Sequence, residues 1–297
     1  MVELKGNVLV LSFPEVHRRA VLKLEFQRTL RIPDDDRDYP LPPGLGRFPL
    51  RQVDAFADTV PEEWLAHGGV LLPMYQAEAM WLYFKSDYPF AVQVATGKVS
   101  AITGTEQADG LHRDPQDYLV TPPQLWLEGY CDEKGIGRQF VAMPLGTAYG
   151  AAEQLAGRAE HGGLQIVVHP MRPEAAERLV RQRRQIDMPG IKFSRARAPS
   201  AGAPGLAPGG RMRQPIYQDP HDSAAWDLGH RGRCFVHLVN SLQWRSITGQ
   251  NPPTDPPTAE SYSIAELPWF DCYDGDARAL AESPLPQNAS IETPVVM

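Results

Sequence analysis

The sequence predicts a strand-rich α+β protein, built mainly from antiparallel β-sheets in a sandwich-like arrangement with two attached helices and an irregular C-terminal part. Several short segments alternate between apolar and polar residues, or are apolar throughout, as β-strands do. Only two segments have helical character, and they do not alternate with the strands as in a βαβ protein. The 25 glycines and 29 prolines among 297 residues indicate many turns and argue against a helical bundle.

The clearest strand signal covers residues 20–32, AVLKLEFQRTLRI, where apolar and polar residues alternate. This pattern predicts a strand with one buried face. Pro33 ends the strand, and the prolines and glycines of residues 33–50 predict a loop.

That loop carries an acidic cluster, which consists of Asp34, Asp35, Asp36 and Asp38. Three of these aspartates are spaced as at the start of a calcium-binding loop. Tyr39 stands where such a loop requires glycine, and Leu45 where it requires the closing glutamate. We therefore expect an acidic, solvated loop.

Three short strands are predicted at residues 80–84, 90–94 and 99–102, with the last two joined across residues 96–98. This succession is typical of a meander. The first of the three is apolar on both faces, which favours a central position between packed layers.

A hairpin is predicted over residues 125–143, with its turn at 132–135, where Gly135 can adopt the positive φ that such a turn needs. The apolar segment LQIVVHP, at 164–170, predicts a further buried strand, and CFVHLVN, at 234–240, predicts another strand.

The two expected helices cover residues 148–160 and 173–185. The first is rich in alanine and precedes two glycines. The second begins with Pro173 and an acidic first turn, both of which favour a helix N-terminus.

The sequence predicts a strand-rich main domain over residues 1–194, a Pro- and Gly-rich connection over 195–211, and a smaller C-terminal part over 212–297. The composition leaves open whether this last part packs on the main domain or forms a domain of its own. It includes the extended, proline-rich segment 251–258 and an aromatic tail around Trp269.

The charge balance disfavours a nucleic-acid partner, because a net charge of −7 would repel the phosphate backbone. The opening residues, MVELKGNVLVLSFPEV, are typical of a strand rather than of a signal peptide, and the apolar runs are too short to span a membrane. Three scattered cysteines favour a reducing compartment. We therefore expect a cytoplasmic protein without a membrane partner.

Five stretches carry a resemblance to known sequences: HGGVLLPMYQAEAMWL, LHRDPQDYLV, GRQFVAMPLG, EHGGLQIVVHPM and APGGRMRQPIY. Through them, nearly the whole chain resembles a functionally unassigned family of bacterial cytoplasmic proteins. The resemblance implies a bacterial cytoplasmic setting, but it implies no activity, cofactor or catalytic residue.

The segment LHRDPQDYLV is the main candidate for a catalytic loop, because it gathers His112, Asp114 and Asp117. Its HRD motif is that of a protein kinase. However, Pro115 stands where the kinase loop has leucine, and Leu119 where it has the metal-binding asparagine. A turn is the simpler interpretation, and an acid–base pair or metal ligands are the alternative.

Two other groups of histidines are candidates for metal binding. His230, Cys234 and His237 have a suitable spacing, but in a strand Cys234 and His237 point to opposite faces. His161 and His169 would lie about 26 Å apart along an extended strand, too far to share an ion. His161 could still join His112 in a composite site.

A basic segment over residues 172–197 has five excess positive charges in an acidic protein. We expect it either to be solvated or to bind an anionic partner, including the acidic cluster of another copy. The interaction residues expected are Arg178, Arg181, Arg183 and Arg184 on the basic side and Asp34, Asp35, Asp36 and Asp38 on the acidic side.

The leading hypothesis is a non-enzymatic cytoplasmic structural or interaction protein that self-associates into an oligomer or larger assembly. No cofactor is expected, since neither a phosphate-binding loop nor a nucleophile motif is present in the sequence. The alternative is a hydrolase or metal-assisted enzyme that uses the loop of His112, Asp114 and Asp117, together with His161. The third hypothesis is a carbohydrate-binding module that uses the tryptophans Trp126, Trp226, Trp244 and Trp269.

Overall fold

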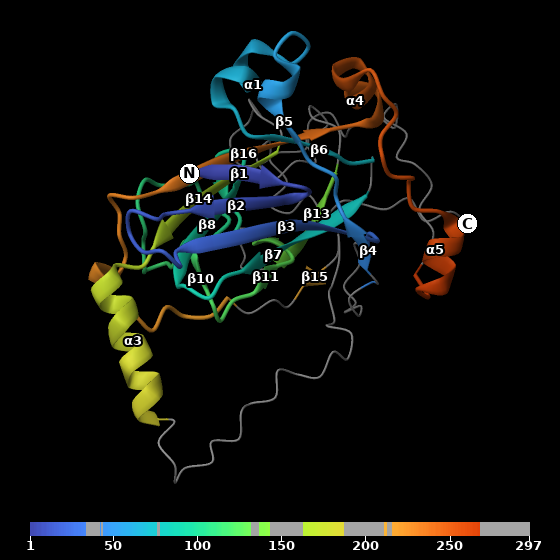
Figure 1. Cartoon of the computed structure of the whole chain (residues 1–297). Helices are drawn as coiled ribbons and strands as arrows, with labels where there is room; N and C mark the ends of the chain where they lie inside the picture. The colour runs from blue at the N-terminus through green and yellow to red at the C-terminus, as the bar shows by residue number, and fades with distance from the viewer. Residues whose placement is uncertain are drawn as a thin grey trace.

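Two β-sheets packed face to face form the body of the protein (Figure 1). The structure is a computed structural model that describes residues 1–33, 42, 44–75, 78–131, 137–142, 163–186, 211–212 and 216–267. Almost all strand pairs in it are antiparallel, with helices at the periphery, so the predicted α+β sandwich is confirmed.

The first sheet has the strand order β1-β2-β3-β7-β13-β12. Shorter strands extend it, with β4 beside β3, β11 beside β7 and β15 beside β13. The strand bounds are β1 Val2–Lys5, β2 Val8–Ser12, β3 Val21–Thr29, β4 Gly44–Arg47, β7 Ala79–Lys85, β11 Trp126–Leu127, β12 Gly129–Cys131, β13 Gly137–Val141 and β15 Arg211–Met212.

The second sheet has the order β10-β8-β14-β16-β6-β5, with β9 beside β8. Only the pair of β16 and β6 runs parallel among the described strands. The bounds are β5 Arg51–Gln52, β6 Val70–Pro73, β8 Phe90–Thr96, β9 Val99–Ser100, β10 Leu119–Thr121, β14 Leu164–Pro170 and β16 Gly232–Val239.

The core lies between the two sheets and is built by the alternation seen in the sequence. In β3, Leu22, Leu24 and Phe26 are fully buried, whereas Lys23 between them is exposed. These side chains join one apolar cluster with residues of the second sheet, such as Val92 of β8. The predicted strand with one buried face is thus confirmed.

The expected meander is wrong in one respect, because β7 and β8 belong to different sheets. The chain crosses from one sheet to the other through residues 86–89. The Ser86 hydroxyl donates to the Val21 carbonyl of the first sheet, and the Tyr88 hydroxyl donates to the Met171 carbonyl next to the second. Both strands are apolar on both faces, so periodicity could not distinguish a hairpin from a crossing between sheets. The prediction that β7 is not an edge strand is confirmed, since it lies between β3 and β13. Only one of its faces is fully buried, because Trp81 and Tyr83 on the other face are partly exposed.

The two predicted hairpins are present. Strands β8 and β9 pair antiparallel, and Gly97 in their turn has a φ of 61°, which favours glycine. Strands β12 and β13 also pair antiparallel, while their turn at 132–135 lies outside the described residues. The strands expected at 164–170 and 234–240 correspond to β14 and β16.

Helix α3, Pro173–Ile186, confirms the second predicted helix. The first, at residues 148–160, lies outside the described part of the chain. Several short elements were not predicted from the sequence, namely helices α1 Glu62–His67, α4 Ser241–Thr248 and α5 Ala259–Ile264 and the 3₁₀ turns η1 Val53–Phe56 and η2 Ser223–Ala225. No helix in the described ranges is both long and apolar enough to cross a bilayer.

Residues on both sides of the expected connection contribute to the same sheets. Strand β16 lies between β14 and β6, in the interior of the second sheet. Strand β15 pairs with β13 of the first sheet. The connection itself, residues 195–211, lies outside the described residues except for Arg211.

Candidate functional site

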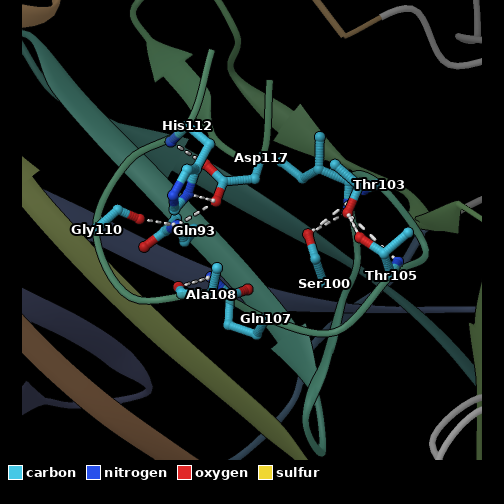
Figure 2. A network of polar contacts seen from close by, with 10 residues as sticks. Gln93, Ser100, Thr103, Thr105, Gln107, Ala108, Gly110, His112 and Asp117 are labelled. Atoms are coloured by element: carbon cyan, nitrogen blue, oxygen red, sulfur yellow. Dashed lines mark hydrogen bonds and ion pairs between the residues drawn. The ribbon is translucent and has the colours of Figure 1, made fainter. Parts of the chain in front are cut away.

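The loop between β9 and β10 carries His112, Asp114 and Asp117, the three residues singled out in the sequence. A series of hydrogen bonds shapes this loop (Figure 2). At its start, the Ser100 hydroxyl accepts from the backbone N–H groups of Ile102 and Thr103. Further along, the Gln107 N–H donates to the Lys98 carbonyl.

Asp117 is the centre of the loop's polar network. Its side chain is 9% exposed, and both of its oxygens accept hydrogen bonds. Oδ1 accepts from the backbone N–H of His112 at 2.9 Å. Oδ2 contacts Nδ1 of the His112 ring at 3.0 Å and accepts from Nε2 of Gln93 at 3.0 Å. The carboxylate therefore closes the loop on itself and fastens it to the second sheet.

Gln93 supplies that attachment from the middle of β8, as Figure 2 shows. Its amide donates both to Asp117 and to the Gly110 carbonyl, at 2.8 Å. Gln93 is buried between Val92 and Val94, and a buried amide needs such partners. Gln93 was not predicted as a site residue, although a glutamine in the middle of the apolar segment FAVQVA was a readable signal.

His112 is the exposed member of the network, with 49% of its side chain accessible. A buried carboxylate at Nδ1 fixes the orientation of the ring and directs Nε2 away from that carboxylate. General bases are oriented in this way in many enzymes. Asp114 is exposed on the intervening turn. The structure thus brings His112 and Asp117 together, whereas His161 lies outside the described residues.

The same loop is joined to a chain segment about a hundred residues further on. The Arg113 guanidinium donates to the Asp219 carbonyl at 3.0 Å, and the Asp219 N–H donates to the Gln116 side chain at 2.8 Å. The Asp219 carboxylate, which is buried, accepts from the Tyr118 hydroxyl at 2.6 Å and from the Trp226 indole at 2.9 Å. These contacts favour a structural role for the loop, which connects residues 113–118 to residues 219–226.

Cys234 and His237 do not converge on an ion. Cys234 is buried in the core, and burial raises the pKa of its thiol to about 12. His237 lies on the other face of β16, where it stacks on Trp64 and contacts the Gly68 carbonyl at 2.9 Å. Within the described ranges, no group of three or more His, Cys, Asp or Glu side chains could hold a metal ion.

The tryptophans proposed as a sugar-stacking platform have separate environments. Trp226 is buried beside Tyr118, and Trp244 is buried in a second cluster with Val53 and Ile247. Trp126 is partly buried, and Trp269 lies outside the described residues. Neither buried tryptophan presents a face to a ligand.

Two buried acids were not anticipated. Burial raises the pKa of Glu128 to about 7, although a hydrogen bond from the Trp126 indole at 2.8 Å acts against the shift. Burial also raises the pKa of Glu78, which forms an ion pair with Arg28 at 2.7 Å. A lone glutamate among apolar residues, as in LWLEGYC, was the available signal for Glu128.

The basic segment begins as α3, whose first turns pack on the core through Ala175 and Ala176. Arg178 and Arg181 are exposed, and Arg181 pairs with Glu177 one turn before it at 3.1 Å. Figure 1 shows the rest of α3 extending away from the sheets.

Several of the expected interaction residues have no described side chain. Arg183 and Arg184 belong to the last turns of α3, where only the backbone is described. The acidic cluster, which consists of Asp34, Asp35, Asp36 and Asp38, lies outside the described residues.

Comparison with protein-family models, with curated proteins and with solved structures finds no match to this chain. The family resemblance stated from the sequence therefore stays a prediction.

Proposed function

We propose that the protein is a non-enzymatic interaction protein of the cytoplasm that associates with copies of itself, with α3 as its basic docking element. The cytoplasmic part of the proposal is supported by the three scattered cysteines. The docking part is supported by the position of α3 and by the charges it carries.

The observation that carries the proposal is the way α3 leaves the body of the molecule. Its first turns are anchored in the core, and its continuation extends away from the sheets with Arg178 and Arg181 exposed (Figure 1). The helix sequence adds Arg183 and Arg184 after them. An arginine-rich helix on a chain of net charge −7 has an attractive orientation toward a second copy.

The acidic counterpart includes the cluster of Asp34, Asp35, Asp36 and Asp38 predicted from the sequence. Exposed acids also gather on η1, on α1 and in the turn between them, namely Asp54, Asp58, Glu62 and Glu63. Figure 1 places α1 and α3 at opposite ends of the molecule. Contact between these two different surfaces would be head to tail, which permits open assemblies as well as rings.

Sedimentation at low and high salt tests the proposal. We expect the wild type to form assemblies at low salt that dissociate at high salt, because salt screens exposed charges. The variant Arg178→Glu/Arg181→Glu should sediment as a smaller species at low salt. The control Arg18→Glu/Arg19→Glu changes the net charge equally at exposed residues between β2 and β3, and it should assemble like the wild type.

Two results would contradict the proposal. A wild type that is monomeric at both salt concentrations excludes self-association. Equal assembly of the wild type and the α3 variant excludes α3 as the docking element. Circular dichroism checks that α3 still forms in the variant, since like charges at positions 177 and 181 cost a helix a few tenths of a kcal/mol.

A hydrolase or metal-assisted enzyme is the second candidate, because the contact of Asp117 with Nδ1 of His112 is the geometry that orients a general base. Stoichiometric metal in the purified wild type that is lost in His112→Ala would favour this candidate over the first.

A further inference from the structure

Strand β1 forms the border of the first sheet (Figure 1). Among the described strands it pairs only with β2. Met1 and Ser12 exchange both backbone hydrogen bonds, at 2.8 and 2.9 Å. Since such pairs recur at every second residue of an antiparallel ladder, residues 3 and 5 also bond to β2. The N–H and C=O groups of Val2 and Leu4 therefore point away from the sheet.

Side chains at the N-terminal end of this border are accessible. Met1 is 73% exposed and Val2 is 37% exposed. Leu4 is partly buried against the core. An edge strand with outward-facing backbone groups is a template for a further strand, unless charge or shape prevents the pairing.

We infer that the β1 edges of two copies pair antiparallel about a two-fold axis, with Leu4 opposite the partner's Leu4. Outward-facing residues must oppose one another, which also allows Val2 opposite the partner's Leu4. The Val2–Leu4 register places Glu3 opposite the partner's Glu3, where like charges destabilise a sheet. A third register, centred on Val2, pairs only residues 1–3 and gives Lys5 no residue of the partner opposite it. The register centred on Leu4 places Glu3 opposite the partner's Lys5, and Lys5 opposite the partner's Glu3.

The charges on β1 therefore identify a second copy as the occupant of the edge. Glu3 and Lys5 lie on one face of the strand and form an ion pair at 2.8 Å, with 39% and 66% of their side chains exposed. Across the two-fold axis the four charges alternate in sign, and each residue gains an opposite-charge neighbour. On the other face, the two Leu4 side chains meet at the margin of the cores.

This inference rests on the proposed self-association but uses residues other than those of α3. Edge pairing is isologous, whereas the α3 contact is head to tail, so the two together would link dimers into larger assemblies. The edge contact can thus be tested alone in the background variant Arg178→Glu/Arg181→Glu.

Charge exchange on β1 is the test. In that background, Glu3→Lys places two lysines opposite each other, and Lys5→Glu does the same with glutamates, so each single variant should lose the dimer. Mixed together, the two should form a heterodimer, because every cross-strand pair is again of opposite sign. The double variant Glu3→Lys/Lys5→Glu should dimerise with itself as the background protein does.

Sedimentation over a concentration series gives the dimerisation constants, and native mass spectrometry with one isotope-labelled partner identifies the heterodimer. We expect at least a tenfold weaker homodimer in each single variant. The inference is overturned if the background protein stays monomeric at its highest soluble concentration. It is equally overturned if the single variants dimerise like the background protein, or if their mixture gives no heterodimer. A failure of the α3 proposal gives a different result. In that case the variant Arg178→Glu/Arg181→Glu, whose β1 is unchanged, assembles like the wild type.

Discussion

At the scale of single residues, a few polar side chains in apolar strands explain the shape of the candidate site. Gln93 is buried in β8, and its two acceptors belong to a loop that follows later in the chain. A buried amide without partners would destabilise the strand, so the loop and Gln93 depend on each other. The sequence allows a prediction that His112 and Asp117 lie in one turn. It gives no distance between that turn and β8, because this contact depends on the tertiary fold.

The first prediction at this scale concerns Gln93. Gln93→Leu should lower the free energy of unfolding by about 1–3 kcal/mol, because the Gly110 carbonyl and the Asp117 carboxylate lose a buried donor. His112→Ala should cost less than about 1 kcal/mol, since the ring is half exposed. Urea denaturation measures both values, with Gln250→Leu at an exposed position as the control. A larger loss for His112→Ala than for Gln93→Leu would show that the ring, rather than the amide, holds the loop.

Glu128 leads to a prediction about pH. Burial raises its pKa from 4.5 to about 7 in the folded protein, so between these values the folded state retains a proton that the unfolded state has released. Stability should therefore fall as the pH rises through this window, by up to about 3 kcal/mol. Glu128→Gln removes this titration and retains an acceptor for the Trp126 indole.

Urea denaturation at about pH 5 and about pH 8 measures this effect. The wild type should lose more stability than Glu128→Gln between the two conditions, whereas Glu106→Gln, at an exposed glutamate, should follow the wild type. Identical pH dependence in the wild type and Glu128→Gln would rule out a buried, titrating Glu128.

At the scale of elements, local sequence patterns identified most of the longer strands and the partners within two hairpins, but not how the other strands pair. Strand β3 was predicted because one face meets the core and the other meets solvent, so its sequence alternates. Strand β8 is buried on both faces, and the partly buried face of β7 carries aromatic side chains, so their sequences contain no alternation that distinguishes the two sheets. The crossing between the sheets depends on contacts of Ser86 and Tyr88 with distant backbone groups.

The short helices show a different limit. Helix α4 begins with a capping box in which the Asn240 side chain accepts from the Gln243 N–H, and Gly249 caps its C-terminus. These signals were present in the sequence, but a helix of eight residues gives too few turns for a convincing apolar stripe. It is stabilised by burying Trp244 and Ile247 against Val239 of β16, which is a tertiary contact.

At the scale of the whole molecule, strands from both sides of one Pro- and Gly-rich stretch share the same sheets. The Pro- and Gly-rich stretch at 195–211 has the composition of a connection between domains. Nevertheless, β16 follows it in sequence and lies between β14 and β6 in the second sheet. The composition of a segment indicates only its own local conformation. The position of the strand that follows depends on which strands of the sheet have edges free to pair with it.

A cut within that stretch should therefore leave the molecule in one piece. With a specific protease sequence inserted after Leu206, we expect the two fragments to co-elute in size-exclusion chromatography without denaturant and to separate only in denaturant. The physical reason is that β16 bonds to strands on both sides, while Cys234 and Val236 are buried in the core. The hydrogen bonds of Arg113 and Gln116 with the 217–219 segment connect the two fragments at a second place.

The uncut insertion variant is the control for the effect of the insertion itself. Fragments that separate without denaturant would show that residues beyond the cut form a unit of their own, held to the rest mainly by the covalent chain.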